Sequence, residues 1–242
     1  MTIQNEVFEA QLATIYSLVK LSETRDDDTG AHIQRVAEYC KMIATVLQHN
    51  PKYRYYIDNK YISNLHKVSP LHDVGKVSIP DSILLKPDKL TQAEFEIIKT
   101  HTTEGAETLE EVKKQYPDNQ FLSMGVSIAC SHHEKWDGSG YPYGLIGEEI
   151  PLSARIVALA DVYDALRSKR VYKPGYSHEK CVEIIRSSAG NHFDPEIVEA
   201  FLLVEQDFDR VFSGAPALNL SKQNNMGSIG GGQLEINKIH IL

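Results

Sequence analysis

Histidine and aspartate residues are grouped in short patches along this chain of 242 residues, and the patches lie roughly one helix and one loop apart. The patches supply eight nitrogen or oxygen groups of the kind that bind divalent metals, and no thiol: Asp28, His32, His72, Asp73, His101, His132, His133 and Asp161. With this spacing, each patch can lie on its own helix and all can converge on one point inside a bundle. The sequence therefore favours a helical bundle around a polar centre, which is the geometry that a polynuclear hydrolytic site requires.

Apolar residues recur at three- and four-residue spacing along nearly every segment, which predicts helices. We expect helices over residues 8–22, 31–50, a segment that passes through His72 and Asp73 to Gly75, 92–101, 119–133, 153–166, 177–190 and 195–204. The expected capping residues are Thr91 (in a capping box with Glu94), Ser153, Ser177 and Asp194. Gly105 is expected to mark or perturb a helix junction. Only short hairpins are candidate strands, so the predicted fold class is all-α.

Composition narrows the class of protein. The hydrophobic content of 42% is enough for one substantial core, which fits a single domain with a tail. The net charge of -8 argues against binding to nucleic-acid polymers, because phosphate contacts need clustered lysines and arginines. The chain has no long apolar run and no secretory signal, and its three cysteines form no CxxC pair. We therefore expect a cytoplasmic protein with reduced thiols and no membrane segment.

The individual patches are weak evidence for a metal site. A single histidine on a helix is usually structural, and adjacent residues on a helix point about 100° apart. The structural interpretation applies to His49, His66, His178 and His240. Asp28 and His32 are four residues apart, so both can face one ion, although an ion pair is an alternative for Asp28. Only the combination of all the patches indicates a metal centre.

Longer sequence strings carry a specific resemblance that runs from Arg25 to Phe201, about three quarters of the chain. The strings are RDDDTGAHIQRV, PLHDVGKVSIPDSILLKPDKLT, IKTHTTEGAETL, CSHHEKWDGSGYPYGLIGEEIPLSARIVALADVYDALRSKRVYK and GNHFDPEIVEAF. In these strings the chain resembles the HD-GYP family of metal-dependent phosphodiesterases, within the HD hydrolase superfamily. The combination of HHExxDGSGYP with DVYDAL is much more specific than an HD pair alone.

The resemblance implies a helical bundle of the HD superfamily with a central polynuclear metal site. Six residues are implied as ligands of two adjacent divalent ions, with Asp73 bridging them: His72, Asp73, His101, His132, His133 and Asp161. One branch of the family has an acid, often Glu, four residues before its first histidine and holds a third ion. Asp28 and His32 occupy these positions here. Nitrogen and oxygen ligands without sulfur suit iron or manganese, and zinc or nickel could substitute.

The implied reaction uses a hydroxide that bridges the ions beside Asp73 for in-line attack on phosphorus. Lys76 resembles the family lysine that meets the scissile phosphate, and a solvated surface lysine is the alternative. Arg170 and Lys173 resemble positions that hold the second phosphate or a guanine of a cyclic dinucleotide, but a basic helix end also serves the helix dipole. Tyr141 of the GYP loop (residues 138–142) is implied to contact the ligand, while ordinary turn chemistry would explain the neighbouring glycines equally well.

The implied activity is that of a cyclic di-GMP phosphodiesterase, which opens the ring to pGpG and forms pGpG, GMP or both. One alternative is hydrolysis of another cyclic dinucleotide, such as 3',3'-cyclic GMP-AMP. A second is an HD-type di-iron oxygenase, against which the GYP loop and Lys76 argue. A third is a non-catalytic signalling module that binds a diguanylate cyclase (GGDEF) partner through the GYP loop, against which the filled ligand positions argue.

The expected domain organisation is a connector helix over residues 1–22, an HD-GYP catalytic domain over 23–212 and a flexible tail over 213–242. The tail is expected because the composition changes past Phe212 to Ser, Gly, Asn and Gln. An apolar stripe on the connector helix is a candidate homodimer contact, although burial against its own bundle is the commoner explanation. The stripe consists of Phe8, Leu12, Ile15 and Val19.

Overall fold

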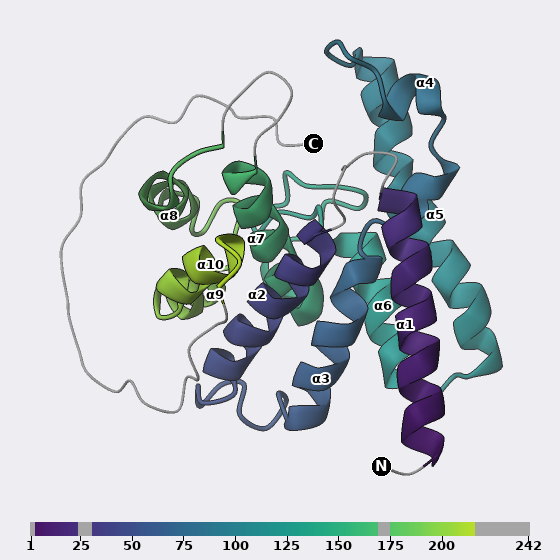
Figure 1. Cartoon of the computed structure of the whole chain (residues 1–242). Coiled ribbons are helices and arrows are strands. Elements are labelled where there is room, and N and C mark those ends of the chain that lie inside the picture. Colours follow the sequence, from purple (N-terminus) through teal and green to yellow (C-terminus); the bar gives the residue numbers. More distant parts are fainter. Residues whose placement is uncertain (1–2, 24–30, 169–174, 216–242) are drawn as a thin grey trace.

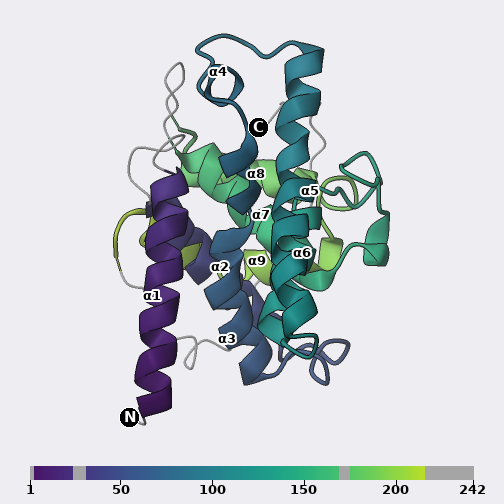
Figure 2. The same ribbon diagram turned by 90° about the vertical axis from the view of Figure 1, so that its right-hand side faces the viewer.

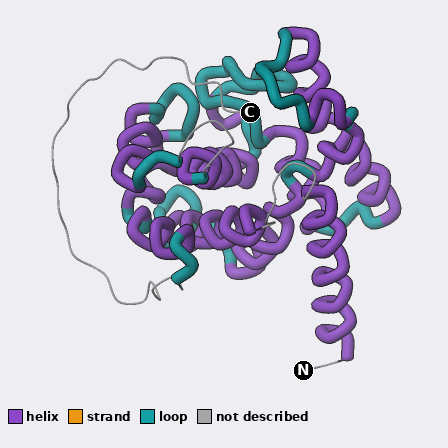
Figure 3. The backbone as a smooth tube through the Cα atoms, turned by 45° about the horizontal axis from the view of Figure 1, so that its top comes forward, coloured by secondary structure: helices purple, strands orange, loops and turns teal. Residues whose placement is uncertain are grey.

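The computed structural model describes residues 3–23, 31–168 and 175–215, and in this part of the chain the regular secondary structure is helical, with loops between the helices (Figure 1, Figure 3). In chain order the helices are α1 (Ile3–Glu23), α2 (Ala31–Leu47), α3 (Asn59–Val68), the 3₁₀ segments η1 (Ser69–Leu71) and η2 (Val74–Ser78), α4 (Asp81–Leu84), α5 (Gln92–Gln115), α6 (Gln120–Ser131), η3 (Gly147–Glu149), α7 (Leu152–Arg167), α8 (His178–Ser187), α9 (Pro195–Leu202) and α10 (Glu205–Phe212). Within the described ranges no strand forms, and pairing is limited to two isolated bridges. The predicted all-α class is confirmed.

Helix α7 lies at the centre of the bundle, where it packs against α2, α6, α8 and α9. Most of its residues are buried, including Ile156, Leu159 and Tyr163, as expected of a helix that is apolar on nearly every side. Helix α2 contributes a narrower buried stripe to the same core, as the three- and four-residue spacing predicted. Helix α1 runs along the outside of the bundle beside α3 (Figure 1, Figure 2), where the Tyr16 hydroxyl donates to the Lys67 carbonyl over 3.0 Å.

The helix predicted to run through His72 and Asp73 to Gly75 is wrong. Helix α3 ends at Val68, and two short 3₁₀ segments follow it. Pro70 explains the break, because its ring clashes with the preceding turn of an α-helix and it has no N–H to donate. The chain continues as tight turns, in which the His72 N–H donates to the Ser69 carbonyl over 3.1 Å. As a result, His72 and Asp73 lie at the junction of η1 and η2.

Helix α5 starts at the predicted capping box, where the Thr91 hydroxyl accepts from the Glu94 N–H and the Glu94 carboxylate accepts from the Thr91 N–H. The junction expected at Gly105 is wrong, because α5 continues to Gln115. Gly105 instead faces Gly75 of η2, where a Cβ atom would lie 2.0 Å from the carbonyl oxygen of His101. Two main chains therefore meet where only glycine fits.

The C-terminal part of the bundle follows the predicted caps with one exception, and it has one helix more than predicted. Ser177 and Asp194 cap α8 and α9 as expected. Ser153 is not a cap, because α7 already begins at Leu152 after Pro151. The last predicted helix, 195–204, forms as α9 and ends at Leu202, and α10 follows it as a further helix that was not predicted; Phe208 of α10 stacks on Tyr39 of α2 with ring centroids 4.2 Å apart.

All three cysteines are free thiols, as the sequence predicted, and Cys40 and Cys181 are buried in the core. Among the described helices, none combines the length and the apolar character needed to cross a membrane.

Candidate metal centre

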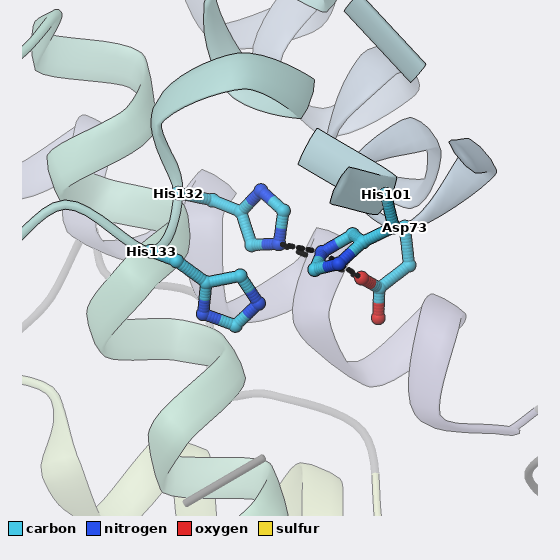
Figure 4. Close-up of side chains that lie close together, drawn as sticks. All are labelled: Asp73, His101, His132 and His133. Carbon is cyan, nitrogen blue, oxygen red and sulfur yellow. Dashed lines mark hydrogen bonds and ion pairs between the residues drawn. The ribbon is translucent and has the colours of Figure 1, made fainter. Parts of the chain in front are cut away.

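The structure brings seven of the eight predicted ligand residues together in two groups. The first ligand group is Asp73, His101, His132 and His133, and the second ligand group is His32, His72 and Asp161. Within each group, the candidate ligand atoms all lie within 4.8 Å of one another. Figure 4 shows how the side chains of the first ligand group point toward one another from separate parts of the chain.

The residues reach this centre from five parts of the bundle. The second ligand group draws on the first turn of α2, the η1–η2 junction and the middle of α7. The first ligand group draws on the same junction, on α5 and on the end of α6, where His132 is the C-cap. Long segments of sequence therefore separate side chains that meet in space, as the spacing of the patches predicted.

Asp73 lies between the two groups. Its Oδ1 atom is 3.2 Å from His101 Nε2 and 3.5 Å from His132 Nε2. Its Oδ2 atom is 3.3 Å from His72 Nε2 of the second ligand group. Each carboxylate oxygen thus faces a different group, which is the arrangement required of a carboxylate that bridges two cations.

The main chain fixes the orientation of three of these imidazoles. The Nδ1 atoms of His72, His101 and His132 lie 2.9, 2.7 and 3.0 Å from the carbonyl oxygens of Ser69, Ile98 and Ile128, respectively. A carbonyl oxygen only accepts, so each Nδ1 must carry the proton and donate it. In the neutral ring, each Nε2 then has its lone pair directed into the centre, and this is the form in which histidine binds metal.

His32 is held differently. Its Nδ1 atom lies 2.8 Å from Oδ2 of Asp164, and its Nε2 atom lies 3.3 Å from Oδ1 of Asp161. Sequence analysis did not single out Asp164. The available signal was its position three residues after Asp161, which puts both aspartates on one face of α7.

Two buried atoms of the centre lack hydrogen bonds. His72 Nε2 and Asp73 Oδ1 are buried and find no hydrogen-bond partner of suitable geometry among the described residues. A buried polar atom without a partner costs about 1–3 kcal/mol. A divalent cation would satisfy both atoms, and imidazole nitrogens with carboxylate oxygens form a suitable ligand set for such an ion. The residues present therefore fit a metal centre.

The electrostatics of the two groups differ. Burial lowers the pKa of His132, and burial with repulsion from His132 lowers the pKa of His133 well below its ordinary value. Burial also acts to lower the pKa of His72, but Asp73 and Asp161 outweigh it and raise that pKa to about 9. His132 and His133 thus favour the neutral imidazole, whereas the carboxylates beside His72 favour its charged form.

Lys76 lies at the edge of the centre. Its Nζ atom is 2.9 Å from Asp73 Oδ2, and its side chain is 21% exposed. Lys76 is therefore not an ordinary solvated surface lysine. Its ammonium group is paired with the carboxylate of Asp73, which faces both ligand groups.

The GYP loop covers His133. The Tyr141 ring stacks on the His133 ring with centroids 4.8 Å apart and planes 25° apart. Buried Glu134, which sequence analysis did not single out, accepts from the N–H groups of Tyr143 over 2.7 Å and Leu145 over 3.1 Å. The signal for Glu134 was a charged residue directly after the His132–His133 pair. Its carboxylate fixes the loop that carries Tyr141.

Three predicted site residues, Asp28, Arg170 and Lys173, lie outside the residues that the structure describes. Two of the histidines given a structural interpretation are held by acidic partners away from the centre: His66 pairs with Glu38 over 2.9 Å, and His178 pairs with Glu205.

Comparison with known proteins gives related sequences and a related fold. A cyclic di-GMP phosphodiesterase of Vibrio cholerae is 53% identical over 205 residues, which are 85% of this chain and 42% of that protein. A 3'3'-cGAMP-specific phosphodiesterase 2 of the same organism is 41% identical over 208 residues, which are 86% of this chain and 37% of that protein. The chain thus spans less than half the length of these two relatives.

A crystal structure of a cyclic GMP-AMP specific phosphodiesterase from V. cholerae shares the fold, with a TM-score of 0.53 and 19% sequence identity. The likeness covers 81% of this chain and 50% of that one. The family model described as HD domain matches residues 17–197, a span that includes all seven residues of the two ligand groups. The chain therefore belongs to the HD domain family, as its HD-GYP motifs predicted.

Proposed function

We propose that this chain is the catalytic part of a cyclic di-GMP phosphodiesterase, a metal-dependent hydrolase of phosphoric diesters. The observation that carries the proposal is the position of Asp73, whose two oxygens face two groups of imidazole nitrogens. Two adjacent cations on a shared carboxylate suit in-line attack on a phosphodiester. The name of the 53% identical relative supports the choice of substrate.

Asp73 and the rest of the first ligand group would hold one divalent ion, and Asp73 with the second ligand group would hold another. Iron or manganese suits these nitrogen and oxygen ligands, with zinc or nickel as substitutes. We further propose a third ion that involves Asp28. When bound, such ions lower the pKa of a water molecule and polarise phosphoryl oxygens.

The remaining roles belong to side chains around the ligands. Lys76 would place its ammonium group against a phosphoryl oxygen, since it already lies 2.9 Å from the carboxylate between the two groups. Tyr141 would form one wall of the substrate site over His133, where its stacked ring shields that imidazole from water. Arg170 and Lys173 would hold the half of the dinucleotide that is not being cleaved.

A role in binding a diguanylate cyclase is a second candidate for the GYP loop. Directly after this loop, two large apolar side chains are exposed, Tyr143 at 68% and Ile146 at 59%, and such a surface is of the kind that a protein partner covers. Homodimer formation through α1 and a cytoplasmic location stay predictions from the sequence.

The function is tested by loading the purified chain anaerobically with Fe²⁺ or Mn²⁺ and incubating it with cyclic di-GMP, 3',3'-cyclic GMP-AMP and cyclic di-AMP. Chromatography should show pGpG, GMP or both from cyclic di-GMP as the preferred substrate. Faster cleavage of cyclic GMP-AMP would move the assignment to that substrate. Dioxygen consumption without hydrolysis would favour an oxygenase, and a metal-loaded protein inert toward all three would contradict the proposal.

A further inference from the structure

The imidazole of His32 is held between two carboxylates of a single helix. Asp161 and Asp164 lie three residues apart on one face of α7, and they approach opposite nitrogens of the ring. Asp161 lies at Nε2, on the side of the second ligand group, and Asp164 lies at Nδ1, on the side away from it. A rotation of this ring would therefore break one of the two contacts.

The carboxylate of Asp164 is itself held in place beside His32. Its side chain is 0% exposed, and Arg35 donates to both of its oxygens, from Nε to Oδ1 over 2.6 Å and from Nη2 to Oδ2 over 2.8 Å. A two-point contact of this kind fixes the plane of a carboxylate as well as its charge. Arg35 lies one helical turn after His32 on α2. The contacts of Asp164 with His32 and with Arg35 therefore both join α7 to α2.

Helix α10 covers the outer side of this arrangement. The Phe212 ring of α10 lies under two guanidinium groups. The Cζ atom of Arg35 is 5.1 Å from the centroid of this ring, and that of Arg167 is 4.6 Å from it. Arg167 also pairs with Asp209 of α10 over 2.5 Å. Helix α10 lies beyond the residues that match the HD domain family, yet it packs against the arginine that holds Asp164.

We propose that Asp164 is a positioning residue for the metal centre. It accepts a hydrogen bond from His32 Nδ1–H, so that Nε2 presents its lone pair to the second ligand group, and Arg35 and α10 keep its carboxylate in place. This role rests on the proposed function, since it assumes that the two groups hold metal ions. Its consequence is selective: loss of Asp164 weakens the ion of the second ligand group and spares the ion of the first.

The test uses the variant Asp164→Asn, titrated with Mn²⁺ as the sole metal. The quantity measured is the amount of metal bound to the protein at each fixed concentration of free Mn²⁺. An asparagine cannot satisfy His32 and both Arg35 donors at once. We expect the affinity for one ion to fall about 10- to 100-fold, the range found when partners of ligand histidines are replaced. The other ion should bind as in the wild type.

The matched control is Asp194→Asn. Asp194 is also a buried aspartate paired with an arginine, Arg155, over 2.6 Å, but it caps α9 and does not contact His32. The control should lose folding stability and keep both ions. The proposal would be overturned if Asp164→Asn bound both ions with wild-type affinity. It would also be overturned if the affinity for both ions fell equally.

A measurement on the wild-type chain keeps the test decisive if Asp164→Asn does not fold. In the Zn²⁺-loaded protein with ¹⁵N-labelled histidine, His32 should show a slowly exchanging Nδ1–H resonance that is absent from His32→Gln. A His32 that binds zinc through Nδ1 would sink the proposal. None of these readouts uses hydrolysis, so inactivity toward cyclic dinucleotides would contradict the proposed function and leave the role of Asp164 standing.

Discussion

The two ligand groups differ in what holds their histidines. In the first group, His101 and His132 donate to carbonyl oxygens of their own helices, and such partners are present whatever the neighbouring side chains are. In the second group, His72 is held by a carbonyl oxygen in the same way, but His32 donates to a side chain of another helix. The second group therefore depends, for one of its two histidines, on a single aspartate that one substitution can remove.

The largest effect is expected from Asp73, the residue of the first ligand group that also faces the second. Asp73→Ala should bring hydrolysis below detection and reduce bound metal in both groups, because each carboxylate oxygen faces one of them. Elemental analysis and product chromatography measure these two losses, and circular dichroism should show that most helical content remains. Loss of metal from one group alone would mean that Asp73 does not bridge.

Substitution of Lys76, which lies next to Asp73, should change the rate of hydrolysis without changing the amount of bound metal. Lys76→Ala is expected to slow hydrolysis about 100- to 1,000-fold while the bound metal stays as in the wild type, because the ammonium group acts on the phosphate. Lys180→Ala, which removes a surface lysine paired with Glu183, is the control and should change neither quantity. A Lys76→Ala protein that loses metal would reassign Lys76 to support of Asp73.

A change predicted to lie outside both groups should affect substrate affinity alone. Arg170→Ala should weaken binding of cyclic di-GMP by roughly 1.5–3 kcal/mol, or about 10- to 100-fold, which is typical for a charge-assisted hydrogen bond. Hydrolysis of bis(p-nitrophenyl) phosphate, which has neither a guanine nor a second phosphate, should barely change. If Arg170→Ala lowers the hydrolysis of both substrates equally, Arg170 supports the fold or the metal centre.

The smallest expected change concerns the proposed third ion only. Asp28→Ala should lower bound metal by about one ion and leave the pair of ions at Asp73 in place, because that pair has its own ligands on other elements. Metal analysis after dialysis measures the loss. An unchanged metal count would return Asp28 to the alternative of an ion pair at the start of a helix.

Local signals in the sequence predicted much of the fold. Thr91, Ser177 and Asp194 begin their helices as expected, because a cap depends only on the residues that follow it. The break at Pro70 was also a local signal, but the apolar spacing around it led to the wrong prediction of a continuous helix. Gly105 was misassigned for another reason: its partner, Gly75, belongs to a distant segment.

The candidate site was predictable where the motif names its residues. Seven predicted ligands lie together in the structure, and their binding of metal stays a prediction to be tested. Asp164 and Glu134 were missed because their roles depend on what lies opposite them. Asp164 meets His32 only through the packing of α7 on α2, and Glu134 meets Tyr143 only through the path of the GYP loop.

The contact between Gly75 and Gly105 also bears on the order in which the centre forms. It closes a segment of moderate length, and residues 73–133 contain the whole first ligand group. His32 and Asp164, in contrast, are separated by 132 residues. Because closing a longer loop costs more entropy, contacts within the shorter segment form more readily as a chain folds. A metal ion that meets a partly folded chain should therefore find the first ligand group assembled before the second.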